Sequence, residues 1–148
     1  MVSSIILFDV DNTLLYNGGA GSVAMRRAFH QLYGIEDGFS RVEFSGRTDW
    51  SILREAMRLH NLLDGRGEAA FGQEIARFVE TYYSLLPGTL REAEGGRVMP
   101  GVPELLAALS ERSDVRQGLA TGNFREAAFM KLRHFDIGDQ LARAKQNR

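Results

Sequence analysis

The chain begins with an apolar run that stops abruptly at two acids. Residues 5–8 are all hydrophobic, and Asp9 and Asp11 follow with a single valine between them. A short, continuously apolar run bounded by turn residues predicts a strand that is buried on both faces, as in a parallel sheet. We therefore expect a strand over residues 5–10, with Asp9 and Asp11 at its carboxyl end, where open parallel sheets bind ligands.

A long helical stretch follows this first strand. Apolar side chains at helical spacing predict three successive helices, over residues 25–32, 52–63 and 71–86. Gly34 is expected to close the first helix, Asp49 to be the N-cap of the second, and Pro87 to stop the third. Because no strand pattern lies between residues 20 and 95, this stretch predicts a helical insert.

The alternation of strands and helices resumes after the insert. We expect a helix over residues 102–109, a strand over residues 115–120 and a helix over residues 124–135. Asn123 and Glu126 have the spacing of a capping box at the start of the last helix. The order of elements is typical of an α/β fold that is interrupted by a helical lobe.

This division predicts two domains. Residues 1–16 and 97–148 form the α/β core, which has a Rossmann-like parallel sheet, and residues 17–96 form a helical cap. The connecting residues 16–21 and 95–99 are the expected hinges. A lobe inserted directly after the acidic loop can act as a lid over that loop.

Composition and charge exclude several classes of protein. The 148 residues carry a net charge of -1, which gives no electrostatic basis for binding nucleic acid or an anionic membrane. The absence of cysteine excludes disulfides, thiolate metal sites and a cysteine nucleophile. No apolar run approaches the ~20 residues that span a bilayer, and the start lacks the features of a signal peptide. We therefore expect a cytoplasmic protein with neither nucleic acid nor membrane as a partner.

Two short motifs resemble those of a known family. The first strand with its Asp-Val-Asp-Asn-Thr sequence resembles motif I of the haloacid dehalogenase-like hydrolase superfamily, and Thr121 after the second strand resembles motif II. The Thr-Gly-Asn form and the Gly-Arg-Thr-Asp loop at residues 46–49 look like phosphoglycolate-phosphatase-like members with a helical cap. The resemblance covers nearly the whole chain and implies the same core and cap.

The resemblance implies a role for each acid. Asp9 would be the nucleophile that forms an aspartyl-phosphate, and Asp11 would be the general acid and base. Mg²⁺ would bind an Asp9 oxygen and the backbone carbonyl of Asp11, offsetting the repulsion between Asp9 and a phosphate dianion. Because the dehalogenases of the family lack the second acid, Asp11 favours phosphoryl transfer on a small phosphorylated metabolite. The structural alternative is that the acids only form a turn and a helix cap.

The phosphate would be held from the second motif. The Thr121 hydroxyl and the backbone N–H groups of Gly122 and Asn123 are the expected donors, although Asn123 is equally placed to be an N-cap. Lys131 leans toward the start of its helix and is the candidate for the family's third motif, the alternative being a solvated lysine. Arg47 either reaches from the cap to the distal group of the substrate or is an exposed surface charge.

The fourth motif of the family, one or two acids after a later strand, has no clear counterpart. Asp139 is a weak candidate metal ligand because no strand-like run precedes it. The chain looks shortened relative to the family, which would leave one edge of the first strand unpaired and prone to self-association. Two alternatives to a phosphatase therefore stay open: a catalytically impaired chain that binds metal or phosphate without turnover, and a phosphomutase.

Overall fold

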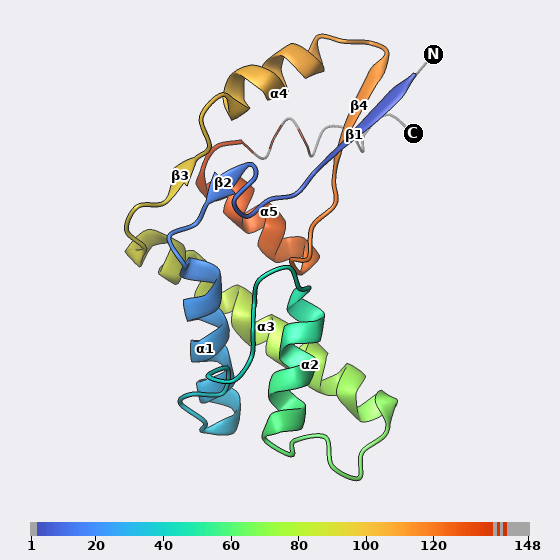
Figure 1. The fold of residues 1–148 in the computed structure, drawn as a ribbon. Helices are drawn as coiled ribbons and strands as arrows, with labels where there is room; N and C mark the ends of the chain where they lie inside the picture. The colour runs from blue at the N-terminus through green and yellow to red at the C-terminus, as the bar shows by residue number, and fades with distance from the viewer. Residues whose placement is uncertain (1–2, 138, 140, 142–148) are drawn as a thin grey trace.

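An α/β core and a lobe of three helices lie at opposite ends of the computed structural model (Figure 1), which describes residues 3–137, 139 and 141. The lobe holds the helices α1 (Ala20–Tyr33), α2 (Asp49–Leu59) and α3 (Glu68–Glu92). The core holds β1 (Ser4–Phe8), β2 (Leu15–Tyr16), β3 (Arg97–Val98), α4 (Val102–Ser110), β4 (Val115–Leu119) and α5 (Arg125–His134). Within these described residues, no helix has the length and apolarity needed to cross a bilayer.

The core is built on a parallel pair of strands. β1 and β4 are in register from Ser4 opposite Val115 to Phe8 opposite Leu119. The two strands are therefore confirmed, each ending slightly earlier than expected. Helices α4 and α5 contribute to one apolar cluster beside the strands, whose buried members are Val10, Leu14, Leu15, Val102, Leu106, Ala128, Leu132, Ile137 and Leu141.

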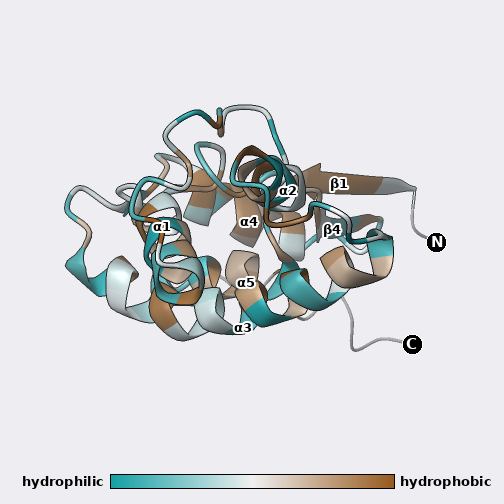
Figure 2. Cartoon of the chain, turned by 90° about the horizontal axis from the view of Figure 1, so that it is seen from below, coloured by the Kyte–Doolittle hydropathy of each residue, from teal (hydrophilic) through white to brown (hydrophobic). Residues whose placement is uncertain are grey.

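The expectation that β1 is buried on both faces is wrong. Ile5 is 71% exposed and Leu7 is 59% exposed, whereas Phe8 packs against the cluster shared by α4 and α5. Side chains alternate along a strand, so the helices cover the face of Phe8 and leave the face of Ile5 and Leu7 open among the described residues. Figure 2 shows β1 as an apolar strand at the margin of the molecule. Self-association through this strand stays a prediction.

The helical lobe has its own apolar core. The Phe29 ring lies edge-on to those of Tyr33, Phe39 and Phe78. Other buried side chains of the lobe come from all three helices and include Ala24, Met25, Ile52, Leu53, Met57, Phe71, Tyr82 and Leu86. This core holds α1, α2 and α3 together and so fixes the surface that faces the acids.

Two predicted details of the lobe are wrong. The N-cap of α2 is Thr48, whose hydroxyl accepts a hydrogen bond from the Ser51 N–H at 3.2 Å, and Asp49 is the first residue of the helix. Helix α3 continues through Pro87 to Glu92 instead of stopping there. Its last turns stay helical because they bury Leu90 and other side chains in the lobe, and packing of this kind outweighs the one backbone bond that proline removes.

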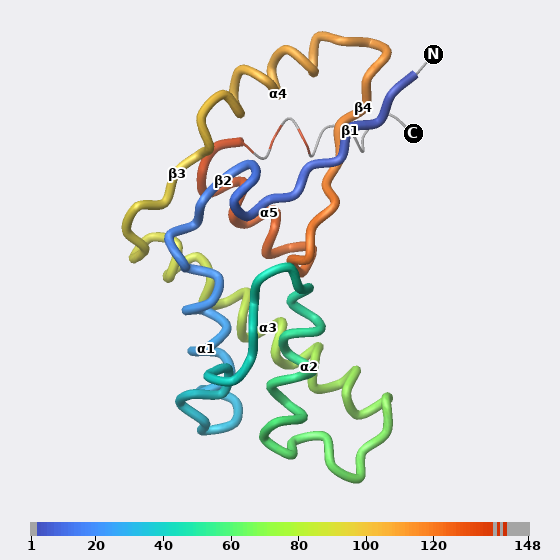
Figure 3. The backbone as a smooth tube through the Cα atoms, viewed as in Figure 1, coloured from blue at the N-terminus to red at the C-terminus, as the bar shows by residue number. Residues whose placement is uncertain are grey.

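The two connections between core and lobe lie side by side (Figure 3). Leu15 and Tyr16 of β2 pair antiparallel with Val98 and Arg97 of β3. Both expected hinges are thus joined by a small ribbon that the sequence pattern did not indicate. The ribbon places the start of α1 next to the acidic loop after β1, so the lobe begins beside the candidate site.

Candidate active site

A cavity of about 670 Å³ lies where the carboxyl ends of β1 and β4 meet the lobe. The core lines it with the loops after the two strands and with Lys131 of α5. The lobe lines it with the start of α1, the loop of residues 44–49 and Tyr82 of α3. The cavity therefore brings together residues that are more than 100 positions apart in the sequence.

Asp9 and Asp11 both line this cavity. Val10 between them is fully buried, and its carbonyl accepts hydrogen bonds from the N–H groups of Leu14 at 2.9 Å and Leu15 at 3.1 Å. This tight turn holds the valine in the core and leaves the acids at the cavity. Asp9 is exposed, whereas Asp11 is half-buried.

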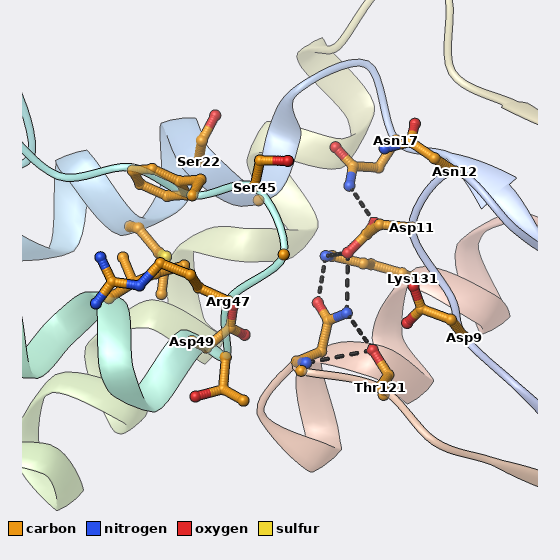
Figure 4. A pocket seen from close by; sticks show the side chains of 18 of the residues that line it. Asp9, Asp11, Asn12, Asn17, Ser22, Ser45, Arg47, Asp49, Thr121 and Lys131 are labelled. Atoms are coloured by element: carbon orange, nitrogen blue, oxygen red, sulfur yellow. Dashed lines mark hydrogen bonds and ion pairs between the residues drawn. The ribbon is translucent and has the colours of Figure 1, made fainter.

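Lys131 is the centre of a hydrogen-bonded network around Asp11 (Figure 4). Its ammonium, which is nearly inaccessible to solvent, donates to Asp11 Oδ2 at 2.6 Å and to Asn123 Oδ1 at 2.5 Å. Asn123 Nδ2 donates to Asp11 Oδ2 at 2.9 Å and to Thr121 Oγ1 at 2.7 Å. Asn17 Nδ2 donates to Asp11 Oδ1 at 2.5 Å, so both oxygens of Asp11 are engaged.

This network sets the charge of Asp11. Burial raises the pKa of Asp11, but the Lys131 ammonium and the hydrogen bonds from Lys131, Asn123 and Asn17 outweigh burial and hold that pKa below its ordinary value. The carboxylate is therefore ionised at neutral pH. The ionised form can accept a proton, whereas the protonated form that could donate one is disfavoured by Lys131.

Thr121, Gly122 and Asn123 follow β4 directly. Thr121 Oγ1 accepts from both the N–H of Asn123, at 3.2 Å, and its side-chain amide, so the hydroxyl proton of Thr121 points elsewhere and is available to an anion. Of the two backbone donors expected for a phosphate, the Asn123 N–H is used by Thr121, whereas the Gly122 N–H has no partner among the described residues. The expected capping box is wrong, because Asn123 turns to Asp11 and Lys131 while Glu126 pairs with Arg133.

Arg47 is among the residues that line the cavity, but its guanidinium is engaged by neighbours in the lobe. Its guanidinium forms an ion pair with Glu55 and donates to the carbonyls of Ser51, at 3.2 Å, and Glu43, at 3.4 Å. Figure 4 shows this side chain pointing away from Asp9. Contact between Arg47 and a substrate therefore stays a prediction.

Asp139 does not complete a metal site. It is exposed and lies beyond the end of α5. Across residues 3–137, 139 and 141, no group of three or more histidine or acidic side chains is placed to hold a metal ion. Asp49 also lines the cavity, but its carboxylate accepts the Phe124 N–H, so Asp9 and Asp11 stay the candidate metal ligands.

Several residues that line the cavity were not predicted from the sequence as site residues, among them Asn17, Asp49 and Tyr82. Asn17 lies in a glycine-rich loop, the sequence predicts Asp49 only as a helix cap, and Tyr82 lies within the third expected helix. Burial, together with the negative charges of Asp49 and Asp11, raises the pKa of Tyr82 well above its ordinary value, which keeps its hydroxyl a neutral donor. The Gly-Arg-Thr-Asp loop was the one signal that could have identified Asp49.

The fold is similar to that of several solved structures. CbbY from Rhodobacter sphaeroides, solved in complex with phosphate, is 20% identical with a TM-score of 0.55, and the match covers 96% of this chain and 62% of CbbY. A haloacid dehalogenase-like family protein from Streptococcus pneumoniae is 17% identical with a TM-score of 0.53, covering 95% of this chain and 59% of that one. A protein from Haemophilus somnus, described as a predicted phosphoglycolate phosphatase, is 16% identical with a TM-score of 0.53, covering 93% and 60%.

These likenesses concern the fold, and the chain spans about 60% of the length of the three proteins. Among curated protein sequences, none matches. The sequence itself matches the model of the haloacid dehalogenase-like hydrolases over residues 4–146, which confirms the expected resemblance to this family. With so much of the sequence matched, the chain belongs to the haloacid dehalogenase-like hydrolase family.

Proposed function

We propose that this chain hydrolyses a small phosphorylated metabolite through an aspartyl-phosphate on Asp9, with Mg²⁺ as the cofactor. The observation that carries the proposal is the placement of an exposed carboxylate, Asp9, in one cavity with the network of Thr121, Asn123, Lys131 and Asp11. The cavity thus supplies a nucleophile, a fixed cation and a hydroxyl donor for the phosphate oxygens.

The proposed reaction has two steps. An Asp9 oxygen bonds to phosphorus as the bond to the leaving alcohol breaks, and the alcohol oxygen takes a proton. Water then attacks the phosphorus of the aspartyl-phosphate, which restores Asp9 and releases phosphate. In both steps Lys131 and the Thr121 hydroxyl would stabilise the negative charge on the phosphoryl oxygens.

Asp11 is better suited to the second step than to the first. Its lowered pKa favours the ionised form, which can take a proton from the attacking water. Donating a proton in the first step requires that Asp11 first be protonated, which its ion pair with Lys131 disfavours. Substrates whose leaving groups need no proton should therefore react faster than alkyl phosphates, by a factor set by how rarely Asp11 is protonated.

The residues present fit Mg²⁺ as a cofactor. This ion prefers one or two protein oxygens together with phosphate oxygens and water. Among the described residues the Asp9 carboxylate has no hydrogen-bond partner, so its oxygens are open to a cation, while Asp11 would contribute its backbone carbonyl. When bound, Mg²⁺ would neutralise charge on the phosphoryl group as Asp9 approaches it.

The test is hydrolysis of para-nitrophenyl phosphate with and without Mg²⁺. We expect turnover that needs Mg²⁺, that Asp9→Asn abolishes, and that Asp37→Asn, which changes an exposed acid of the lobe, leaves intact. Mass spectrometry of the quenched protein should find one phosphoryl group on Asp9. Equal turnover in the parent chain and in Asp9→Asn would exclude Asp9 as the nucleophile.

A second candidate is a protein that binds phosphate without turnover. It is favoured because the described residues contain no group of three or more histidine or acidic side chains that is placed to hold a metal ion. It predicts that phosphate protects the chain against unfolding, that Lys131→Met removes this protection, and that no phosphoryl-Asp9 forms. The phosphomutase alternative lacks such support, because the charge of Arg47 is already engaged by Glu55.

A further inference from the structure

The loop that begins α2 and the loop that begins α5 are joined by two reciprocal hydrogen bonds. The Asp49 N–H donates to the carbonyl of Gly122 at 2.7 Å. In return, the Phe124 N–H donates to Asp49 Oδ2, also at 2.7 Å. Asp49 belongs to the lobe and the other two residues belong to the core, so these bonds cross the boundary between them.

Asp49 is free to make this contact because its own helix is capped by another residue. The Thr48 hydroxyl caps α2. Helix α5, in contrast, receives no side-chain hydrogen bond from its N-cap residue, Phe124. The Asp49 carboxylate supplies the missing acceptor at the start of α5, where free N–H groups and the helix dipole favour a negative charge.

The contact also explains why position 122 is glycine. A Cβ atom there would lie 2.7 Å from the carbonyl oxygen of Arg47 and 3.1 Å from Cα of Thr48. These are backbone atoms, so a side chain would push the two loops apart. Close approach of lobe and core at this point therefore depends on Gly122.

The turn that Asp49 contacts also carries Thr121 and Asn123, which belong to the proposed phosphate-binding network. Thr121 precedes Gly122 and Asn123 follows it, and Asn123 bonds both Lys131 and Asp11. We propose that Asp49 is a positioning residue, which caps α5 from the lobe and so fixes Thr121 and Asn123 while the lobe lies against the core. The effect on turnover rests on the proposed phosphatase function, whereas the capping contact does not.

Amide hydrogen exchange at Phe124 tests the contact independently of activity. Asp49→Ala removes the acceptor and should lower the protection of the Phe124 amide at least about fivefold, the effect of losing a typical N-cap. Asp49→Asn retains an oxygen acceptor of the same size and should stay within about twofold of the parent chain. Asp37→Ala, at an exposed acid elsewhere in the lobe, is the matched control.

A second variant opens the same contact without changing Asp49. Gly122→Ala should reduce the protection of Phe124 as Asp49→Ala does. Gly72→Ala, where an added methyl group meets nothing within 4 Å, should leave it unchanged. Circular dichroism of each variant shows whether it is folded, and the Asp49→Asn and Gly122→Ala chains decide the question if Asp49→Ala does not fold.

Kinetics then distinguish positioning from chemistry. In an active chain, kcat/KM should fall in Asp49→Ala and return in Asp49→Asn, because an amide replaces a hydrogen-bond acceptor but not an acid or base. Unchanged protection of Phe124 in Asp49→Ala would overturn the proposal, as would an Asp49→Asn chain with protection as low as that of Asp49→Ala. If the parent chain proves inactive, the phosphatase function fails while the exchange data still decide the role of Asp49.

Discussion

Replacing Lys131 with methionine should destabilise the chain strongly at neutral pH. Lys131 is 3% exposed, and its ammonium is bonded to Asp11 and Asn123. Methionine retains most of the apolar stem, so the change removes a charge and leaves little empty space. The result is a carboxylate, Asp11, that is partly buried and has lost its counter-ion.

The size of the effect follows from the burial of both partners. Removing one member of a fully buried ion pair costs about 3–5 kcal/mol. The Asp11 side chain is 32% exposed, and water therefore solvates part of its charge. We expect Lys131→Met to lower the free energy of unfolding by about 2 kcal/mol at neutral pH.

The effect should shrink in acid. In the parent chain burial raises the pKa of Asp11, but Lys131 and the other donors hold it below its ordinary value of 3.8. The ionised Asp11 therefore adds stability that is present above that value and is lost as the pH falls through the lowered pKa. Without Lys131, less opposes the effect of burial, and the pKa of Asp11 rises. Protonation of Asp11 in acid therefore restores stability to the variant, whereas it removes stability from the parent chain.

Urea unfolding of four chains measures this coupling: the parent, Lys131→Met, Asp11→Asn and the double variant. At neutral pH the double variant should be more stable than Lys131→Met alone, and the gap between parent and Lys131→Met should narrow near pH 4. Arg133→Met, in the exposed pair with Glu126 on the same helix, should cost less than about 1 kcal/mol. A Lys131→Met cost that is independent of pH, or unrelieved by Asp11→Asn, would refute the reasoning.

Three further substitutions test the packing of the lobe, each by the free energy of unfolding measured in urea. Phe78→Ala, at a fully buried ring, should lower the free energy of unfolding by about 3–5 kcal/mol, and a loss under about 1 kcal/mol would contradict the described core. Gly38→Ala places a methyl group against the Phe29 ring and should cost about 1–3 kcal/mol, whereas a neutral result would mean that the ring can move. Gly72→Ala, at an exposed helical position, should add about 0.5–1 kcal/mol, and destabilisation would argue against helix there.

Local patterns predicted most of the elements because the lobe and core follow simple periodicities. The apolar run before Asp9 forms β1, and the helical spacing in the insert forms three helices. Burial of β1 was not predictable in the same way. Apolar composition shows that a strand can be buried, but whether Ile5 is covered depends on elements packed against that face.

Errors at helix ends have a common physical cause. Asn123 has a strong local preference for capping α5, yet its side-chain amide donates a hydrogen bond to Asp11, which lies 112 residues away along the chain. The cap comes instead from Asp49, 75 residues before Phe124. Local preferences amount to about 1 kcal/mol, so tertiary hydrogen bonds in a half-buried site can override them.

The placement of Lys131 was predictable in part. The direction in which helical side chains lean indicated that it would point toward the start of α5, and the structure places its ammonium on Asp11 and Asn123. That the network would engage both oxygens of Asp11 was not evident, because Asn17 comes from a loop without any periodic pattern. Asn17 adds the smallest of the contributions that lower the pKa of Asp11, after the charge and hydrogen bond of Lys131 and the hydrogen bond of Asn123.

The two acids of the site differ in how firmly the chain holds them, and this difference separates the candidate functions. The Asp11 carboxylate accepts hydrogen bonds from Lys131, Asn123 and Asn17, whereas the Asp9 carboxylate has no hydrogen-bond partner among the described residues. Preorganised donors are effective because they need no rearrangement when charge arrives. Lys131, Asn123 and Asn17 already donate to Asp11, so the donor that is ready for a phosphate in this half of the site is the Thr121 hydroxyl. A phosphate-binding protein needs only that half, but a phosphatase also needs Asp9 to be held in line with phosphorus. The position of Asp9 in a phosphate-bound chain is therefore the property on which hydrolysis depends.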